Sequence, residues 1–392
     1  MDVTVAARTT LPLTDVRTEH NARAWLRLLR AGVRASALRK IVETSGSAAA
    51  AVELTRAEWR ASGAEDATLD RLRDPDLVPA SDLAWLDVAD QHLIGWDDPD
   101  YPALLRRIPS PPPALFIAGD PNLLWHAQIA VVGSRNATAG GVDNARDFAR
   151  ALISAGLTIT SGMAEGVDAA AHLAALDAKA PTIAVVGTGT DVIYPRRHAR
   201  LAARIRATGA IVSEFLPGTE ARADHFPRRN RIIAGLALGT LVIEAAERSG
   251  ALITARLAGD AGREVFAVPG SIHNPLARGC HRLIRQGAAL VEDAREVIEA
   301  LAPVAAELAD ALRARLRDAD AADTAFAAGV PVAAPDASER KLIAALGHDP
   351  VGIDQLVERT GLTVAELSSM LLVMELQGLV AAEHGRYIRR QS

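Results

Sequence analysis

The sequence predicts an α/β protein: a Rossmann-like, doubly wound parallel sheet, flanked by an N-terminal helical domain and a C-terminal winged-helix domain. Two observations predict the sheet. Short apolar runs rich in β-branched residues recur through the middle of the chain, and helical stretches lie between them. Strands that are apolar on both faces and alternate with helices are typical of a parallel sheet covered on both sides. A third observation, the order of helices and short strands near the C-terminus, is typical of a winged helix.

Length and composition limit the kind of protein this is. A chain of 392 residues and 41.3 kDa predicts two or three domains. Apolar residues make up 49% of it and aromatic residues only 4%, so it folds around an aliphatic core. One cysteine excludes an internal disulfide framework and a cysteine-based zinc module. We see no export signal and no run approaching the ~18 apolar residues of a membrane helix, so we expect a cytoplasmic protein without membrane contact.

The first region, 1–88, is predicted to be a small helical domain. Its helical patterns are interrupted at Gly32, Gly46 and Gly63, where a helix can end in a left-handed cap. Modules of this kind are usually packing or interaction units, and no chemical motif occurs in this one.

The second region, 89–302, carries the predicted sheet. It contains a proline-rich segment, 97–120, which we interpret as extended because proline removes a donor and disfavours helix at the preceding residue. Helices are predicted at 142–156 and 196–209, among others. The strands are predicted at 129–133, 157–160, 182–187, 210–215, 240–245, 264–268 and 288–292.

The C-terminal part is predicted to be a linker, 303–337, followed by a winged-helix domain, 338–392. Ala, Asp and Pro toward the end of the first segment are typical of a linker. The pattern of the second segment predicts two helices, a turn, a longer helix over 364–378 and two short strands around Gly385. The longer helix has no Arg, Lys or Asn for base edges, so we favour a protein-contact or packing role for this domain.

The loops after the strands are the expected ligand site, because ligands bind beyond the carboxyl ends of strands in an open parallel sheet. These loops are rich in glycine, and the helices that follow them present unpaired N–H groups to an anion. A phosphate-bearing ligand is therefore expected. The chain has no GxxxxGK[ST] motif, and no GxGxxG follows the first strand, so neither a P-loop ATPase nor ordinary dinucleotide binding is supported and we predict no cofactor.

Arginines are concentrated in the same loops. The net charge of −5 argues against a protein that is positive all over, but a nucleic acid responds to charge within a Debye length of about 8–10 Å. Guanidinium contacts to phosphates, together with base stacking on a ring such as Phe226, hold single strands without reading sequence. Seven arginines fall at or just beyond strand ends and are expected on one rim: Arg135, Arg196, Arg197, Arg222, Arg228, Arg229 and Arg231.

Catalytic motifs are scarce. The chain has no HExxH, no GxSxG and no Cys/His set with metal-ligand spacing, so we predict neither an enzyme nor a metal site. Glu214 and Glu244 follow strands and are candidates for acid/base groups, for helix caps or for partners of arginine. Cys280 is interpreted as a small buried apolar residue. Five histidines are interpreted as hydrogen-bonding or surface residues: His172, His198, His225, His273 and His281.

Six segments, in order along the chain, carry a resemblance to a known family. They are GSR (133–135), SGMAEGVDAAAH (161–172), GTGTDVIYP (187–195), FPRRNRIIAGL (226–236), VIEAAERSGALITA (242–255) and REVFAVPG (263–270). The chain resembles the DprA/Smf family, the DNA-processing protein A of bacteria, and the pair FPxRNRIIAGL and SGALITA is highly specific for it. The segment 97–120 is similar too. Family members often carry a SAM-like helical domain before the Rossmann-like domain and a winged helix after it.

The resemblance implies a protein that binds single-stranded DNA, protects incoming DNA and loads the RecA recombinase onto it in natural transformation and homologous recombination. It also implies a homodimer through the Rossmann-like domain and no enzymatic turnover. Carried over by position, the DNA-binding residues are Arg135, Ser161, Gly162, Arg196, Arg222, Phe226, Arg229, Asn230 and Arg231.

Two positions depart from the family pattern. Met163 stands where glycine or leucine is common, so the backbone of its loop is expected to differ. His281 stands where asparagine is usual, so any contact made by that side chain is not carried over.

Two other classes of protein remain open as alternatives. The same layout occurs in lysine-decarboxylase-like nucleotide phosphoribohydrolases, but their PGGxGTxxE motif is absent here. A winged-helix transcription regulator would read duplex DNA through the helix at 364–378, which lacks the side chains for it.

Overall fold

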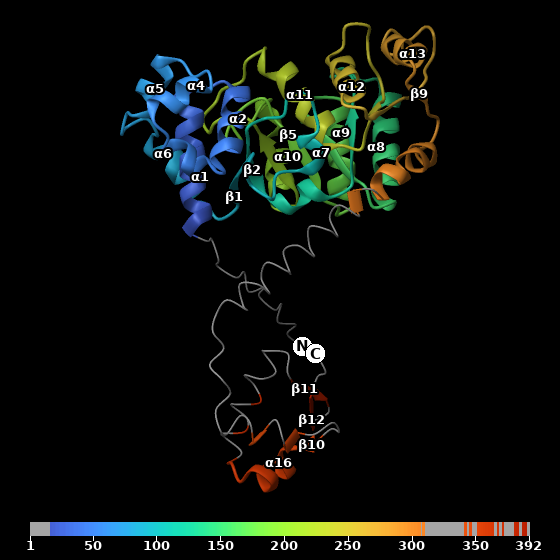
Figure 1. The fold of residues 1–392 in the computed structure, drawn as a ribbon. Helices are drawn as coiled ribbons and strands as arrows, with labels where there is room; N and C mark the ends of the chain where they lie inside the picture. The colour runs from blue at the N-terminus through green and yellow to red at the C-terminus, as the bar shows by residue number, and fades with distance from the viewer. Residues whose placement is uncertain are drawn as a thin grey trace. The chain divides into compact units, whose positions relative to one another are not determined.

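The structure, a computed structural model, describes residues 16–306, 308–309, 341–342, 345–346, 351–363, 367, 371, 380–383 and 386–389. The chain divides into two compact units, Met1–Leu312 and Arg313–Ser392, and each is described by itself. Figure 1 shows the helices and strands of both units, many of them labelled.

A sheet of nine strands runs through the first unit in the order β1-β2-β6-β5-β4-β3-β7-β8-β9. From β6 to β9 in this order, neighbouring strands are parallel. All the strands predicted from the sequence are confirmed, with ends that differ by at most three residues. They are β3 (Gln128–Val132), β4 (Thr158–Ser161), β5 (Thr182–Val185), β6 (Ala210–Ser213), β7 (Gly239–Val242), β8 (Glu264–Ala267) and β9 (Ala289–Leu290).

Two further strands make the sheet mixed rather than wholly parallel. β1 (Gln91–Gly95) pairs antiparallel with β2 (Ala114–Gly119), and β2 pairs antiparallel with β6. The segment 97–120, predicted only to be extended, therefore contains the short helix α7 (Ala103–Arg106) and a strand that is buried along its whole length. The prolines of this segment all precede Ala114, so they do not interrupt the ladder of hydrogen bonds.

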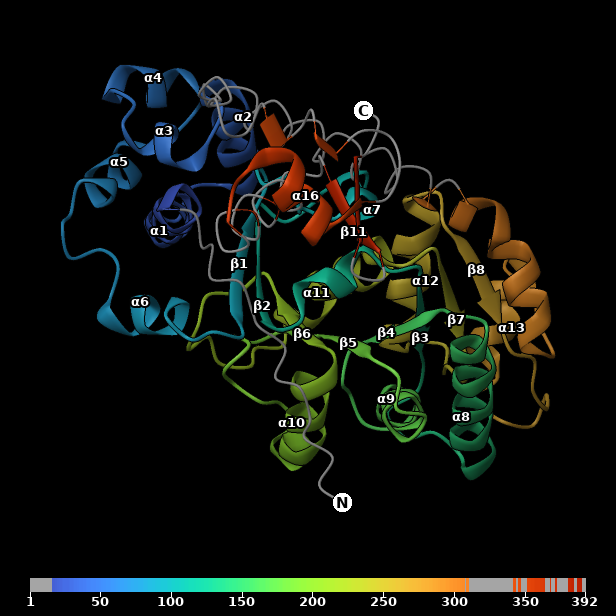
Figure 2. The same ribbon diagram turned by 90° about the horizontal axis from the view of Figure 1, so that it is seen from below.

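Helices cover both faces of the parallel strands (Figure 2). Buried side chains form separate cores on the two faces, as expected for strands that are apolar on both sides. The predicted helices at 142–156 and 196–209 are confirmed as α8 and α10. One face carries α8 (Ala139–Ser154), α9 (Val167–Asp177) and α10 (Ala199–Thr208), and the other carries α11 (His225–Leu236), α12 (Gly250–Asp260) and α13 (Arg278–Arg285).

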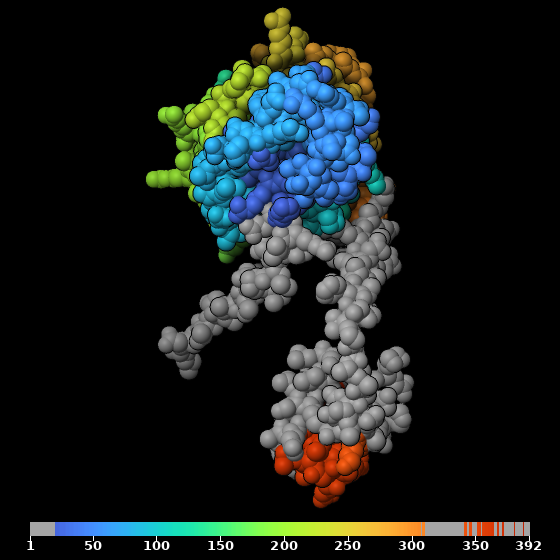
Figure 3. All heavy atoms as spheres, turned by 60° about the vertical axis from the view of Figure 1, so that its left-hand side comes forward, coloured from blue at the N-terminus to red at the C-terminus, as the bar shows by residue number. Residues whose placement is uncertain are grey.

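The N-terminal part is helical, as predicted. Gly32, Gly46 and Gly63 all have the left-handed φ expected at helix ends, +76°, +86° and +89°. The core of this part includes Leu93 and Phe116, so it packs on the β1–β2 edge of the sheet. Figure 3 shows it in blue, continuous with the surface of the first unit. The helices are α1 (Val16–Ala31), α2 (Ala35–Ser45), α3 (Ala48–Val52), α4 (Arg56–Ala61), α5 (Asp66–Leu72) and α6 (Ala80–Leu86).

The second unit has the elements of the predicted winged helix. Its sheet has the order β10-β12-β11, with antiparallel pairing. Most of the predicted helix at 364–378 and most of the predicted linker lie outside the described residues, although 303–306 and 308–309 are helical. The elements are β10 (Val351–Gly352), α16 (Ile353–Thr360), β11 (Val380–Glu383) and β12 (Arg386–Arg389).

The direction of winding in the first unit reverses between β3 and β7. From β3 the chain adds β4, β5 and β6 on one side, then returns to place β7 on the other side of β3. Such a switch point opens a crevice beyond the carboxyl ends of the two neighbouring strands, and this is where ligands bind in open α/β sheets.

Candidate nucleic-acid interface

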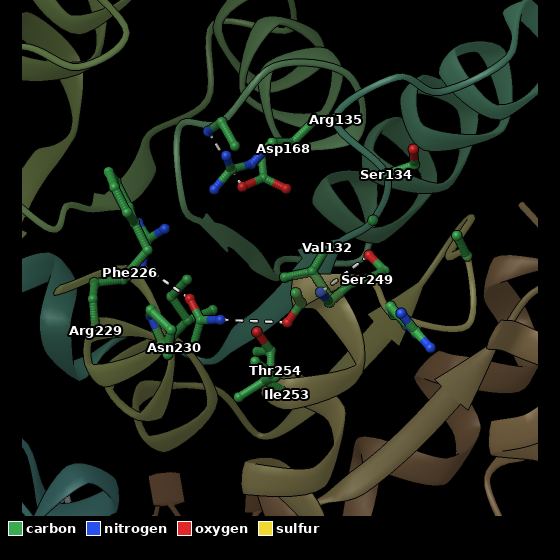
Figure 4. A pocket seen from close by; sticks show the side chains of 18 of the residues that line it. Val132, Ser134, Arg135, Asp168, Phe226, Arg229, Asn230, Ser249, Ile253 and Thr254 are labelled. Carbon is green, nitrogen blue, oxygen red and sulfur yellow. Dashed lines mark hydrogen bonds between the residues drawn. The ribbon is translucent and has the colours of Figure 1, made fainter. Parts of the chain in front are cut away.

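A pocket of about 710 Å³ lies at this switch point (Figure 4). Its walls come from the turn after β3, the start of α9, the first half of α11 and the start of α12. The exposed charged side chains that line it are all arginines, because its one carboxylate, Asp168, is buried. The residues that give the pocket its chemistry are Arg135, Asp168, Tyr194, Arg222, Phe226, Arg229, Asn230 and Arg248.

Arg135 stands on a tightly held turn between β3 and α8. The backbone N–H of Ser134 donates to the carbonyl oxygen of Glu244 across 2.7 Å. On the other side of the turn lies Gly166, with φ +74°, where an added Cβ would be only 2.2 Å from the carbonyl oxygen of Ser134. Arg135 itself is exposed, and its guanidinium lies 5.6 Å from the centre of the Phe226 ring. The turn therefore presents a guanidinium and an aromatic ring side by side.

The helix α11 divides the arginines that the sequence placed on one rim. Its pocket face, at helical spacing, carries Phe226, Asn230 and Ile233. Arg228 and Arg231, three residues apart, lie on another face, where both donate to the same carboxylate oxygen of Glu214. The prediction that all seven arginines lie on one rim is therefore wrong. The reason is that 225–236 forms a helix, whose side chains point in different directions, and not the expected loop.

Arg229 lines the pocket but is buried beneath its surface, with 4% of the residue exposed. Its guanidinium donates to the carbonyl oxygen of Gly162 across 2.8 Å and to that of Val185, and so ties the ends of β4 and β5 together. Burial lowers the pKa of Arg229 to about 10, while the charge of Asp168 opposes that shift. Burial likewise raises the pKa of Asp168. Arg229 stays protonated at neutral pH and holds the floor of the pocket.

Ser161 and Gly162 are also buried and do not line the pocket. The hydroxyl of Ser161 donates to the carbonyl oxygen of Val131 across 2.6 Å. The N–H of Gly162 donates to the carboxylate of Asp168 across 3.1 Å. Ser161 thus joins the end of β4 to β3, and Gly162 joins the end of β4 to the start of α9.

The remaining predicted arginines differ in whether they line the pocket and in whether a carboxylate pairs with them. Arg222 lines it and is exposed, although it forms an ion pair of 3.3 Å with Asp224 at the surface. Arg196 is exposed but does not line the pocket. Arg197 is paired with Glu165.

Three of the eight pocket residues named above were not predicted as site residues: the buried Asp168 and the exposed Tyr194 and Arg248. Tyr194 lies in the loop after β5. Arg248 lies between β7 and α12, two residues before the helix begins. The cap of α12 is Ser249, whose hydroxyl accepts from the N–H of Ala251 across 3.3 Å. An arginine directly before a serine N-cap was the signal available in the sequence for this part of the site.

The two candidate acid/base groups, Glu214 and Glu244, both have hydrogen-bond partners within the protein. Glu244 accepts from the N–H and the hydroxyl of Thr138, the N-cap of α8, and from the side chain of Asn274. Glu214 is held by arginines, as described above. Of these two carboxylates, one therefore supports a helix cap and the other pairs with arginine. Among the residues that the structure describes, no group of three or more His, Cys, Asp or Glu could hold a metal ion.

The histidines with described partners make hydrogen bonds, as predicted, and His273 is exposed. His172 is buried, and its Nδ1 lies 2.8 Å from the hydroxyl of Thr182, which itself donates to the carbonyl oxygen of Ile159. Because the hydroxyl of Thr182 donates its proton to Ile159, it can only accept from the ring. Nδ1 of His172 therefore carries the proton of the hydrogen bond between the two side chains. Burial lowers the pKa of His172 to about 3, and the imidazole is neutral. Three others contact carbonyl oxygens: His198 that of Met163, His225 that of Gly187 and His281 that of Gly270, each at 3.0 Å.

Cys280 is buried, as predicted, and burial raises the pKa of its thiol to about 11. Met163 has φ +57°, in the region that favours glycine, and its side chain is fully buried in a core with Val186 and Leu201. Met163 therefore combines a left-handed backbone with a side chain that fills the core beside it. No helix in the described part of the chain is long and apolar enough to span a membrane.

Fold and site together define an α/β protein with an arginine-lined crevice that also offers an aromatic surface. The chain belongs to the DNA recombination-mediator protein A family, whose model matches residues 92–302. A model of the DprA winged helix domain matches residues 326–386. The family resemblance read from the motifs is thus confirmed.

Known relatives agree with this assignment. The protein Smf of Escherichia coli strain K12 is 44% identical over 310 residues, which cover 79% of this chain and 80% of the relative. The DNA processing protein DprA of Streptococcus pneumoniae strain R6 is 46% identical over 201 residues, or 51% of this chain and 71% of the relative.

Two solved structures are similar as well. The X-ray structure of DprA from Streptococcus pneumoniae has a TM-score of 0.64 at 36% identity and covers 71% of this chain and 97% of its own. A structure of DNA processing protein A from Helicobacter pylori, described for its single-stranded DNA binding mode, has a TM-score of 0.50 at 26% identity. It covers 54% of this chain and 96% of its own.

Proposed function

We propose that this protein binds single-stranded DNA in the pocket at the β3–β7 switch point, protects it, and loads the RecA recombinase onto it in natural transformation and homologous recombination. We also propose that it acts in the cytoplasm as a homodimer formed through the Rossmann-like domain, without enzymatic turnover or a cofactor. The family membership and the single-stranded DNA binding of the Helicobacter pylori relative support this function.

One observation carries the proposal: Arg135 and Phe226 stand side by side in a pocket whose exposed charges are all positive. A guanidinium pairs with a phosphate of the backbone, and a ring accepts the face of a base. In a duplex the bases are already stacked and paired, so their faces are not available to the ring. The same site therefore favours a single strand over a duplex.

Within the predicted set we assign different roles. Direct contact with DNA is proposed for the exposed pocket residues Arg135 and Arg222, for the half-buried ring of Phe226, and for Asn230, which lines the pocket although it is buried. Arg196 is proposed as a peripheral phosphate contact. Support of the pocket from below is proposed for Ser161, Gly162, Arg229 and Arg231, because each is largely buried and uses its polar groups within the protein.

We keep the predicted division of the chain as a proposal: a SAM-like helical domain at 1–88, the Rossmann-like DNA-binding domain at 89–302, a linker at 303–337 and a winged-helix domain at 338–392. The matched region 92–302 supports the second of these domains, and the matched region 326–386 supports a winged helix but begins within the proposed linker. The alternative of a phosphoribohydrolase is not favoured, because the motif PGGxGTxxE is absent and because Glu214 pairs with arginines while Glu244 supports a helix cap.

The test is a binding titration of single-stranded against duplex oligonucleotides over a range of salt concentrations, without ATP. We expect tighter binding of the single strand. We also expect log K to fall linearly with log salt, by about 0.7 for each phosphate that an arginine neutralises on a single strand. Equal affinity for both forms, or a response that is flat with salt, would contradict the proposal.

A further inference from the structure

Tyr194 is an exposed aromatic residue at the edge of the pocket. Its exposed fraction is 46%, and of the large apolar or aromatic side chains exposed to this degree in the described residues it alone lines the pocket. Its ring centre lies 5.4 Å from that of Phe226, with the ring planes tilted by 41°. The two rings therefore form one continuous aromatic surface in a chain of which only 4% is aromatic.

Phe226 is the more covered of the two rings. It is half-buried, with Tyr194 on one side and the guanidinium of Arg135 nearby. A Cβ added at Gly187 would lie 3.1 Å from the ring, so the bare backbone of that glycine also borders it. Much of the surface of Phe226 is thus taken by the protein, and most of the free aromatic surface at the pocket belongs to Tyr194.

The loop that carries Tyr194 is held in place before any ligand binds. The hydroxyl of Thr188 donates to the carbonyl oxygen of Val192 across 2.6 Å, and the N–H of Gly189 donates to the carbonyl oxygen of Thr219 across 2.9 Å. Asp191 accepts from the N–H of Gly218 across 2.9 Å. A ring on an ordered loop loses little further freedom when a base stacks on it, which favours binding.

We propose that Tyr194 is a second stacking residue of the site, so that the pocket takes two successive bases of a single strand, one on Phe226 and the next on Tyr194. This inference rests on the proposed function. The tilt between the rings separates the two bases, and Arg135 beside Phe226 is placed for the phosphate of the first nucleotide. Every base offers a π-face, so the arrangement holds two nucleotides without selecting their sequence.

The first test uses the unaltered full-length protein. Single-stranded oligonucleotides that carry one 5-iodouracil are irradiated in the complex, and the attached residues are identified by mass spectrometry, because this base couples to aromatic side chains that stack on it. We expect attachment to both Tyr194 and Phe226. Attachment to Phe226 with none to Tyr194 would overturn the inference and leave the proposed function standing.

The second test compares variants in a binding titration at one salt concentration. Tyr194→Phe keeps the ring and should bind as the unaltered protein does, whereas Tyr194→Ser should lose about 5- to 150-fold in affinity, the range for one stacked base. Val88→Ser is the matched control, since Val88 is also exposed (40%) but lies outside the pocket.

The outcomes separate the inference from the function on which it rests. A loss from Phe226→Ala with none from Tyr194→Ser would refute the second stacking residue only. If the unaltered protein binds neither single strands nor duplex, the proposed function fails and the inference with it. Circular dichroism confirms that each variant folds.

Discussion

At the scale of single residues, the site depends on which arginines are free and which are used by the protein. Arg228 and Arg231 share one carboxylate oxygen of Glu214, and Arg229 is buried on carbonyl oxygens. Arg135 has no carboxylate partner among the described residues and faces the pocket. An arginine that is free and rigidly placed loses less on meeting a phosphate than one that must first leave a partner.

We expect Arg135→Ala to weaken single-strand binding by tenfold or more, because it removes a charge-assisted contact of roughly 1.5–3 kcal/mol. The matched control is Arg204→Ala. Arg204 lies on the exposed face of α10, where it pairs with Asp177 at 2.8 Å, and it should matter little to the affinity. The measurement is a paired titration at one salt concentration, with circular dichroism to show that both variants fold.

Similar losses from Arg135→Ala and Arg204→Ala would mean that a general positive field accounts for binding. No loss from Arg135→Ala would remove the central residue of the proposed site.

At the scale of elements, the contact between the turn after β3 and the start of α9 sets the position of Arg135. Gly166 is the N-cap of α9, and a side chain there would overlap the carbonyl oxygens of Ser134 and Arg135, at 2.2 and 2.7 Å. The backbone of the turn is thus pressed directly against the beginning of the helix. A change in this contact should reach the ligand through the turn.

We expect Gly166→Ala to lower the affinity for single-stranded DNA several-fold or more, since the turn that carries Arg135 must move to admit the methyl group. Gly156→Ala is the control, because Gly156 also has a left-handed φ, +87°, but a Cβ there meets nothing within 4 Å. It should cost about 1–2 kcal/mol of stability and leave the affinity unchanged. Titration of both variants, with thermal unfolding, measures the two effects; wild-type affinity in a folded Gly166→Ala protein would show that the turn does not position the site.

At the scale of the whole molecule, the pocket is built from one of the two compact units. All of its lining residues lie between Val132 and Leu276, inside the unit Met1–Leu312. The net charge of the chain is −5, yet the exposed charges at the pocket are positive. Local rather than total charge should therefore govern binding.

Deleting residues 338–392 is accordingly expected to leave most of the single-strand affinity, and the slope of affinity against salt, as they are in the full chain. The reason is that none of the side chains that line the pocket belongs to the deleted residues. The comparison is made by titration of the truncated and the full-length protein over the same salt range. A truncated protein that folds but no longer binds would place the DNA site elsewhere.

Local pattern was sufficient for most of the fold and for part of the site. The parallel strands, the helices between them and the glycine caps all depend on residues close together in the sequence, so they were predictable. Arg135 and Phe226 were predictable as candidate site residues because the end of a parallel strand and a family motif both mark them, and both line the pocket. The antiparallel strand β2 was missed because prolines directly precede it and one of its pairing partners, β6, is distant in the chain. Its other partner, β1, was missed with it.

The sequence by itself thus determined the class of fold, the edge of the sheet where the candidate site lies, and the kinds of side chain that are found there. Only the tertiary structure decided which of those side chains are available. The rotation of α11 turned Arg228 and Arg231 toward Glu214, burial committed Arg229 to the ends of β4 and β5, and an anchored loop brought Tyr194 against Phe226. These outcomes depend on the phase of a helix and on contacts between distant segments, and neither is set by the order of residues within one segment.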